Sequence, residues 1–333
     1  MTPNCRFSFL LIFGTWLLSA CETELDLEVA GPPQPIIYGL LSATDTAHYV
    51  RVERTFRSAD EPAIIGATRP DSLYFENIQV FLEKTSSGQR FMLDPVNGAA
   101  EGYPRVEGPF VTDPNRLYTI TADAIDLDPG DQVTLLVDRG PDLPETTATT
   151  TLLEPLQVRT NSPFTPVNMA YERRINFAWG HGPQAATFQV RLHFRIREEP
   201  IGGPARLRTL EWLLAEDLRS DLGNERSAVT ITGEQFYQFL ASELPEEPGT
   251  RRFFEDFSLE VVAGGAELAE ALDLAQANLG LTAAQFVPRF SNIEGGQGVF
   301  SSRAFLRRDG LRLSPASLDS LRDGRITASL NFQ

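Results

Sequence analysis

The most regular stretch of the sequence reads Thr187-Phe188-Gln189-Val190-Arg191-Leu192-His193-Phe194-Arg195-Ile196-Arg197. Apolar and polar residues alternate throughout it, which is the period of a β-strand with one buried face. The even-numbered residues from Phe188 to Ile196 would face a core, and the odd-numbered residues from Gln189 to Arg197 would face away from it. The stretch therefore predicts a long, half-buried strand and, with its surroundings, a mainly β protein.

The outward side of this strand carries a basic stripe, defined here as Arg191, His193, Arg195 and Arg197. In one interpretation, its arginines pair with carboxylates on neighbouring strands of a solvated sheet face. In the other, the stripe is an interface for an acidic partner or ligand. The alternation fits both interpretations, so both remain open at this stage.

Residues 155–333 around this strand predict a β domain with helical insertions. The preceding strand, Ile175–Trp179, ends in a tryptophan, and this tryptophan with the aromatic residues of the next strand resembles a fibronectin-III-like or immunoglobulin-like sandwich. Helices are expected from Thr232, where Thr232 and Gln235 have the spacing of a capping box, from Ala266, and from Ser314. Residues 326–332 alternate in polarity and predict a closing strand.

Residues 36–154 predict a separate N-terminal β-sandwich, of immunoglobulin-like type. About seven short apolar runs are separated by turn signals such as Pro129-Gly130. The boundary is placed at Glu154-Pro155, because this dipeptide and the nearby Asn161-Ser162-Pro163 interrupt the strand pattern. We therefore expect two domains, 36–154 and 155–333.

Before these domains, the chain has the layout of a bacterial lipoprotein signal. Arg6 precedes a short apolar run, which ends in Leu18-Ser19-Ala20-Cys21. We expect residues 1–20 to be a signal peptide cleaved between Ala20 and Cys21, and Cys21 to be lipidated. The run is too short for a span of about twenty residues, so the acyl chains would provide the membrane attachment. Residues 21–35 would form an acidic tether.

Composition excludes several classes of function. The chain has 29 basic and 45 acidic residues and a formal net charge of −16, which disfavours nucleic acid as a partner. Its two cysteines are Cys5, which would leave with the signal, and Cys21. The mature protein would then contain no free thiol, which excludes disulfides, thiolate catalysis and cysteine-ligated metals.

Motifs for catalysis or cofactor binding are absent from the sequence. It contains no His-Glu-x-x-His, no phosphate-binding loop and no Gly-x-Ser-x-Gly, and its three histidines have no ligand spacing. The acidic run Asp123–Asp131 lacks the calcium-loop pattern and is expected to lead into a turn. No cofactor and no enzymatic activity are therefore predicted. A surface hydrolase that acts on glycan or peptide with paired carboxylates remains the alternative.

A glycine-rich stretch, Ser291-Asn292-Ile293-Glu294-Gly295-Gly296-Gln297-Gly298-Val299-Phe300, is the last unusual feature. Its glycines permit positive φ and close approach of the backbone. We expect a structural turn before a strand over 299–306, with a ligand-binding loop as the alternative.

Together, the lipidation motif, the Ile37-Tyr38-Gly39-Leu40-Leu41 strand and the Asn292–Phe300 stretch resemble uncharacterised outer-membrane lipoproteins of Bacteroidota, most closely the domain-of-unknown-function family numbered 4249. Acidic residues directly after the lipidated cysteine resemble those of surface-exported lipoproteins from this group. The resemblance implies no catalytic residues. It implies a lipid-anchored protein of the outer membrane, surface-exposed in one interpretation, with a binding or assembly role beside a TonB-dependent receptor.

Overall fold

The computed structural model describes residues 32–56, 63–159, 165–220, 224–278 and 290–333. The chain divides into two compact units, Met1–Pro33 and Gln34–Gln333. The predicted signal peptide, the cleavage site and Cys21 lie outside the described residues, as does most of the predicted tether. The following description concerns the second unit.

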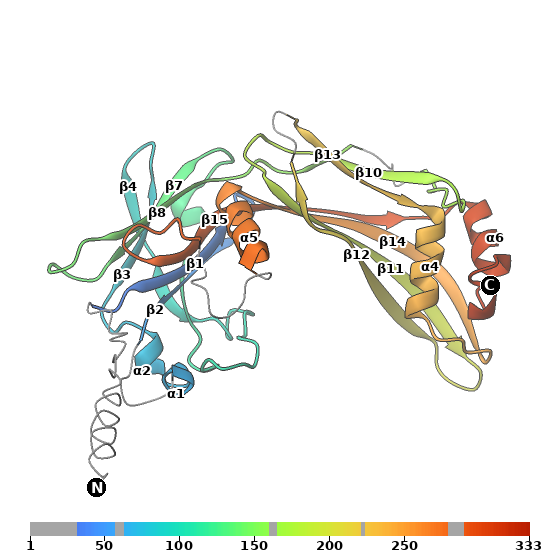
Figure 1. The fold of residues 1–333 in the computed structure, drawn as a ribbon, viewed down its shortest axis with the longest axis horizontal. Helices are drawn as coiled ribbons and strands as arrows, with labels where there is room; N and C mark the ends of the chain where they lie inside the picture. The colour runs from blue at the N-terminus through green and yellow to red at the C-terminus, as the bar shows by residue number, and fades with distance from the viewer. Residues whose placement is uncertain (1–31, 57–62, 160–164, 221–223, 279–289) are drawn as a thin grey trace, which may run out of the picture. The chain divides into compact units, whose positions relative to one another are not determined.

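The second unit is mainly β, as predicted, and is built on one eight-stranded sheet (Figure 1). The strand order is β12-β11-β14-β15-β1-β2-β6-β5, and all pairs are antiparallel except β1 with β15. The strands are β1 (Pro35–Leu41), β2 (Ala47–Arg54), β5 (Asp94–Asn97), β6 (Arg116–Thr121), β11 (Thr187–Pro200), β12 (Arg206–Arg219), β14 (Thr250–Gly264) and β15 (Gln297–Leu311).

A four-stranded sheet packs against the β1-β2-β6 part of the large sheet and closes the N-terminal sandwich. Its order is β4 (Gln89–Met92), β3 (Gln79–Lys84), β7 (Gln132–Asp138) and β8 (Thr146–Thr151). Alternate residues of both sheets meet in one apolar core, among them Ile37, Val50, Leu82 and Leu135, all at 0% exposure. The period of two in these short strands accounts for this arrangement.

A three-stranded sheet covers the β12-β11-β14 part of the large sheet. Its order is β13 (Arg226–Thr232), β10 (Arg174–Gly180) and β9 (Gln157–Val158). The second core lies between these layers and contains Phe177 and Trp179 of β10 with every even-numbered residue of β11 from Phe188 to Ile196. The predicted inner face of β11 is therefore confirmed, and it supplies half of a second sandwich.

Helices are inserted at the predicted places in the second half. In α4 (Gly233–Glu243), Thr232 and Gln235 form the reciprocal hydrogen bonds of a capping box. The others there are α5 (Ala266–Asn278) and α6 (Pro315–Asp323), where the Ser314 side chain accepts from the Ser317 N–H. The first half contains α1 (Ala63–Ala67), α2 (Pro70–Leu73) and α3 (Ala122–Ile125), which the sequence patterns did not predict.

The end of the chain crosses the predicted boundary at residues 154 and 155. Ile293 and Phe300 belong to the N-terminal core, although they follow the second sandwich in sequence. They reach it because the first half of β15 pairs in parallel with β1, from Gln297 opposite Ile36 to Ser302 opposite Leu41. Strand β15 thus belongs to both sandwiches, and the two halves share one sheet.

The glycine-rich stretch makes this parallel pairing sterically possible. Gly298 has φ +117°, and a Cβ atom there would lie 1.9 Å from the Ile37 carbonyl oxygen. The Asn292 side chain donates to the Phe300 carbonyl (2.7 Å) and accepts from the Phe300 N–H (3.0 Å), as a neighbouring strand would. The stretch is a structural turn, in agreement with the first of the two expectations.

The predicted closing strand at residues 326–332 is wrong. Residues Ala328–Leu330 form a 3₁₀ turn, and only Phe332 makes an isolated bridge, to Arg252 of β14. The turn persists because the Arg252 side chain donates to the Leu330 carbonyl at 2.8 Å. Alternation of polarity over seven residues could not predict that a buried guanidinium fixes this backbone.

Candidate functional site

The basic stripe lies on the outward face of the large sheet, as the alternation predicted. Cross-strand pairing places carboxylates around it: Glu211 of β12 is opposite His193, and Glu260 and Asp256 of β14 are opposite Arg191 and Arg195. Same-face neighbours in an antiparallel pair are within reach of long side chains. The register therefore brings Arg191, His193 and Arg195 close to acidic residues.

At the Arg191 end of the stripe, Arg191 and His193 both lie close to the carboxylate of Glu260. The Arg191 Nη1 atom lies 3.6 Å from Glu260 Oε1, and His193 Nε2 lies 3.3 Å from Glu260 Oε2. Arg191 Nε is also 2.7 Å from Glu211 Oε1. Neither Arg191 Nε nor His193 Nε2 has hydrogen-bond alignment at these distances, so the attraction between Arg191 and its two carboxylates is chiefly Coulombic.

At the Arg197 end of the stripe, Arg195 and Arg197 make hydrogen-bonded ion pairs with carboxylates. Arg195 donates to both oxygens of Asp256, one of them at 2.6 Å. Arg197 donates to Glu255 at 2.7 Å and to Glu199, and its guanidinium lies 4.2 Å from the Phe253 ring centroid. The structure thus shows the carboxylate pairing expected of a solvated sheet face, and a role as an interface stays a prediction.

A bulge in β14 supplies a carboxylate for Arg197. Arg195 is opposite Asp256, but the next residue, Ile196, is opposite Phe254, so Glu255 is the extra residue. A bulge residue is turned out of the ladder. Glu255 is therefore exposed and reaches Arg197. On the two sides of Glu255, the alternation of inward and outward residues in β14 is shifted by one residue.

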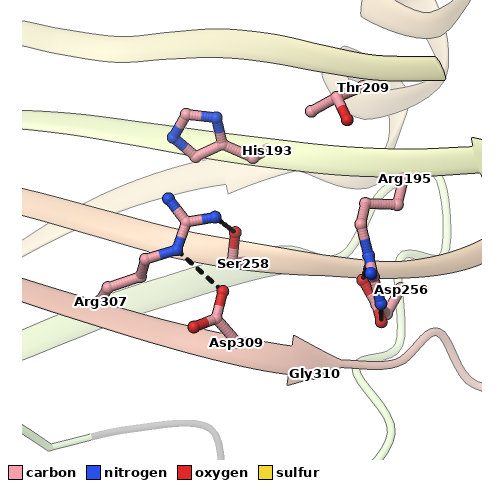
Figure 2. A pocket seen from close by; sticks show the side chains of 8 residues that line it. All are labelled: His193, Arg195, Thr209, Asp256, Ser258, Arg307, Asp309 and Gly310. Carbon is pink, nitrogen blue, oxygen red and sulfur yellow. Dashed lines mark hydrogen bonds and ion pairs between the residues drawn. The ribbon is translucent and has the colours of Figure 1, made fainter. Parts of the chain in front are cut away.

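A depression of about 230 Å³ is lined in part by two residues of the stripe, His193 and Arg195 (Figure 2). Figure 2 shows His193 and Arg307 at one end of it and the Arg195–Asp256 pair at the other. Arg307 of β15 donates to Ser258 at 3.2 Å and to Asp309 at 2.8 Å. The lining residues are His193, Arg195, Thr209, Asp256, Ser258, Arg307, Asp309 and Gly310.

The depression is polar and carries both signs of charge. Hydrogen bonds to carboxylates raise the pKa values of its arginines, chiefly the bond to Asp256 for Arg195 and the bond to Asp309 for Arg307. Both guanidinium groups are therefore permanent cations, held in place by their partners. Such a surface can exchange hydrogen bonds with a polar ligand or with a charged protein surface.

Carboxylates for a hydrolase are present in the depression, but both are engaged. Asp256 accepts from Arg195 and Asp309 accepts from Arg307. Nothing in this arrangement favours the alternative of a carboxylate-dependent hydrolase, which therefore stays a prediction.

The acidic run at residues 123–131 is organised by its own turn. Asp131 pairs with Lys84 at 2.8 Å and accepts from the Asp128 N–H at 2.9 Å. Burial tends to raise the pKa of Asp131, but the hydrogen bonds from Lys84 and Asp128 outweigh it, so the pKa is lowered. In the described ranges, no three acidic, histidine or cysteine side chains are placed to hold a metal ion.

The three histidines occupy separate environments. His181 lies 2.9 Å from the Gly182 carbonyl and 3.0 Å from the Ser227 hydroxyl. His48 is only 2% exposed, and burial lowers its pKa against the opposing attraction of Asp45. His193 belongs to the stripe, so the structure brings none of the three together.

An ion cluster on the inner face of β11 was missed by sequence reasoning. Glu198 and Arg252 are both 0% exposed, and Arg252 Nε donates to Glu198 at 3.1 Å. Arg206 donates to the other oxygen of Glu198 at 2.7 Å, and Arg208 lies 3.3 Å from it. Burial would raise the pKa of Glu198, but the arginines outweigh it and the pKa is lowered.

Arg307 and Asp309 were also missed as part of the outer site. The only signal was the charged run Arg307-Arg308-Asp309 near the end of β15, and the strand with which it pairs was unknown. No helix in the described ranges is both long and apolar enough to span a bilayer.

Comparisons with known proteins give no family for this chain. No protein-family model and no curated protein matches it. Among solved structures, it is similar to the C-terminal globular domain of oligosaccharyltransferase from Pyrococcus abyssi, at 10% identity and a TM-score of 0.25. That similarity covers 71% of this chain and about half (49%) of the other.

A second similar structure is the calcium binding domain CBD12 of CALX1.1. The identity is 9% and the TM-score 0.16, over 80% of this chain and 98% of the other. Neither similarity supports an inference about function at these scores.

Proposed function

We propose that the protein is an outer-membrane lipoprotein with a binding or assembly role at the cell envelope. Lipid at Cys21 would attach it to the membrane, and the outward face of β12-β11-β14-β15 would meet its partner. A TonB-dependent receptor is the candidate partner, on the resemblance to lipoproteins of Bacteroidota. No cofactor is required for this role.

The observation that supports this proposal is the paired charge on the stripe and in its depression. Arg195, Arg197 and Arg307 are held by carboxylates, so their orientation is fixed before any partner arrives. A preorganised charged surface loses less side-chain entropy on binding than a mobile one. Charged groups in such a face contribute to the choice and orientation of a partner.

Co-purification tests the role of the stripe. The lipid-anchored protein is recovered from detergent-solubilised outer membrane, and associated proteins are identified by mass spectrometry. The double variant Arg195→Glu, Arg197→Glu should lose the partner, because it opposes like charges at Asp256 and Glu255. Arg90→Glu is the control, since Arg90 also pairs with two carboxylates, Glu83 and Glu145, but belongs to β4.

Recovery of the protein without any partner would contradict the assembly role. An unchanged partner in the double variant would remove the stripe from the proposal. Attachment is tested separately: Cys21→Ser should abolish labelling by a fatty-acid probe and release the protein from the membrane fraction, whereas Cys5→Ser should change neither.

A further inference from the structure

A second depression, of about 330 Å³, lies at the start of β10. Its lining comes from the segment before β10 and from the first three residues of β10, of which Arg174 and Asn176 are exposed and Ile175 is buried. The exposed side of β10 faces away from the second core, whereas the stripe lies on the outward face of the opposite layer. The lining residues are Thr165, Pro166, Val167, Asn168, Arg173, Arg174, Ile175 and Asn176.

The chemistry of this lining differs from that of the stripe. It contains two exposed arginines and no acidic residue. Within the described part of the chain, no ion pair joins Arg173 or Arg174 to a carboxylate, in a protein whose formal net charge is −16. The neighbouring Glu234 of α4 is paired with Arg325 at 2.8 Å.

The asparagine side chains of the lining are also held by hydrogen bonds. The side-chain oxygen of Asn168 accepts from the Ala170 N–H at 2.9 Å, and that of Asn176 accepts from the Thr230 hydroxyl at 3.3 Å. With its oxygen engaged, the carboxamide NH₂ group of Asn168 is the part of that side chain suited to a ligand, and it can only donate. Guanidinium and amide donors around a space without carboxylates match an oxyanion.

The backbone under these side chains is fixed. The Arg173 N–H donates to the Ala170 carbonyl at 2.9 Å, and the Arg173 carbonyl accepts from Gly233 N–H at 3.0 Å. Val167 is bridged to Leu313 beside β15, and Met169 N–H donates to the buried Ser317 hydroxyl at 2.7 Å. The depression is therefore formed before any ligand binds.

We propose that this depression is an oxyanion-binding site, with Arg173 and Arg174 as the cationic ligands and Asn168 and Thr165 as hydrogen-bonding groups. It takes a carboxylate, sulfate or phosphate group of a small or extended molecule. The two planar guanidinium groups can each bind two oxygens of such a group. This site is independent of the stripe and of the proposed assembly role.

Calorimetric titration of the full-length protein in non-ionic detergent tests the site. The probes are glucuronate, sulfate and inorganic phosphate, with glucose as the neutral control. At least one anion should bind, more weakly at high salt, and glucose should not. The variant Arg173→Gln, Arg174→Gln should weaken binding by at least about tenfold, the effect of losing one charge-assisted hydrogen bond.

Arg226→Gln is the matched control, because Arg226 is an exposed arginine of the same three-stranded sheet outside the depression. It should bind the anion as the unchanged protein does. If the double variant fails to fold, judged by its thermal midpoint, Arg174→Gln alone must still weaken binding severalfold. The proposal is overturned if none of the three anions binds, or if a folded variant binds as tightly as the unchanged protein.

Discussion

The two faces of β11 carry similar charged residues in opposite surroundings. On the inner face, Glu198 and Arg252 are fully buried and share their hydrogen bonds with Arg206 and two backbone carbonyls. On the outer face, Arg195 and Asp256 form a closer pair, at 2.6 Å against 3.1 Å for Arg252 and Glu198, but the Arg195 side chain is 52% exposed. The distance between the charges therefore does not decide what each pair contributes to stability, and burial does.

Burial changes what each pair contributes. A buried charge whose partner is removed keeps its full desolvation penalty, so loss of one member is costly. An exposed charge whose partner is removed is solvated by water instead. The inner cluster should hold the fold together, while the outer pairs should contribute little to stability and be available for recognition.

Removal of the buried guanidinium should have the largest effect. Arg252→Met leaves Glu198 without its buried partner and frees the carbonyls of Leu330 and Pro245. We expect the free energy of unfolding to fall by about 3–5 kcal/mol, measured by urea denaturation. Arg251→Met is the control, since Arg251 is the adjacent, exposed residue paired with Glu199, and it should cost at most about 1 kcal/mol. Equal losses for both would refute the distinction.

Double-mutant cycles should separate the faces next most clearly. Glu198→Gln combined with Arg252→Met should show a coupling free energy of at least about 1 kcal/mol, because the two side chains are in buried contact. The matching outer cycle, Arg195→Gln with Asp256→Asn, should show no resolvable coupling. A larger coupling in the outer cycle would contradict the role assigned to burial.

Acid should weaken the inner cluster. The pKa of Glu198 is lowered in the folded protein, so its stabilising effect is complete above the unfolded value of about 4.3 and is lost as pH falls through the folded pKa. The difference in unfolding free energy between the unchanged protein and Glu198→Gln should therefore shrink below about pH 4. Urea titrations at stepwise lower pH measure it. A difference that stays constant on acidification would show that ionised Glu198 is not stabilising.

Neutralising the outer arginine should have the smallest effect on stability. Arg195→Gln removes hydrogen bonds that water can replace, so the urea midpoint should stay unchanged at both low and high salt. Loss of stability at low salt only would indicate a real electrostatic contribution from the outer pairs. The same variant should retain the 3₁₀ turn at the C-terminus, whereas Arg252→Met should loosen it.

Local patterns predicted much of the fold. The alternation in residues 187–197 gave the strand and its buried face, and Thr232 with Gln235 gave the start of α4. The outward position of the stripe followed from the same period. These features depend on neighbours in sequence, so the side-chain geometry of one strand or one helical turn is enough to predict them.

Features set by register were not predictable in this way. Strict alternation in β14 would place Phe253 and Glu255 inside, together with Phe257. The bulge at Glu255 reverses the parity, which turns Phe253 outward to Arg197 and brings Arg252 inward to Glu198. A single extra residue therefore decides which arginine is buried, and the sequence of β14 contains no signal for it.

By itself, the sequence determined the mainly β class, the period of the strands, the starts of α4, α5 and α6 and the outward stripe, because each arises from the sterics and burial of adjacent residues. Only the tertiary structure decided that β15 joins both sandwiches, that Glu198 meets Arg252, and that Arg307 and Asp309 complete the outer depression. Those outcomes depend on which distant strands pair and in which register, and the interactions that choose the register form only when the chain has closed.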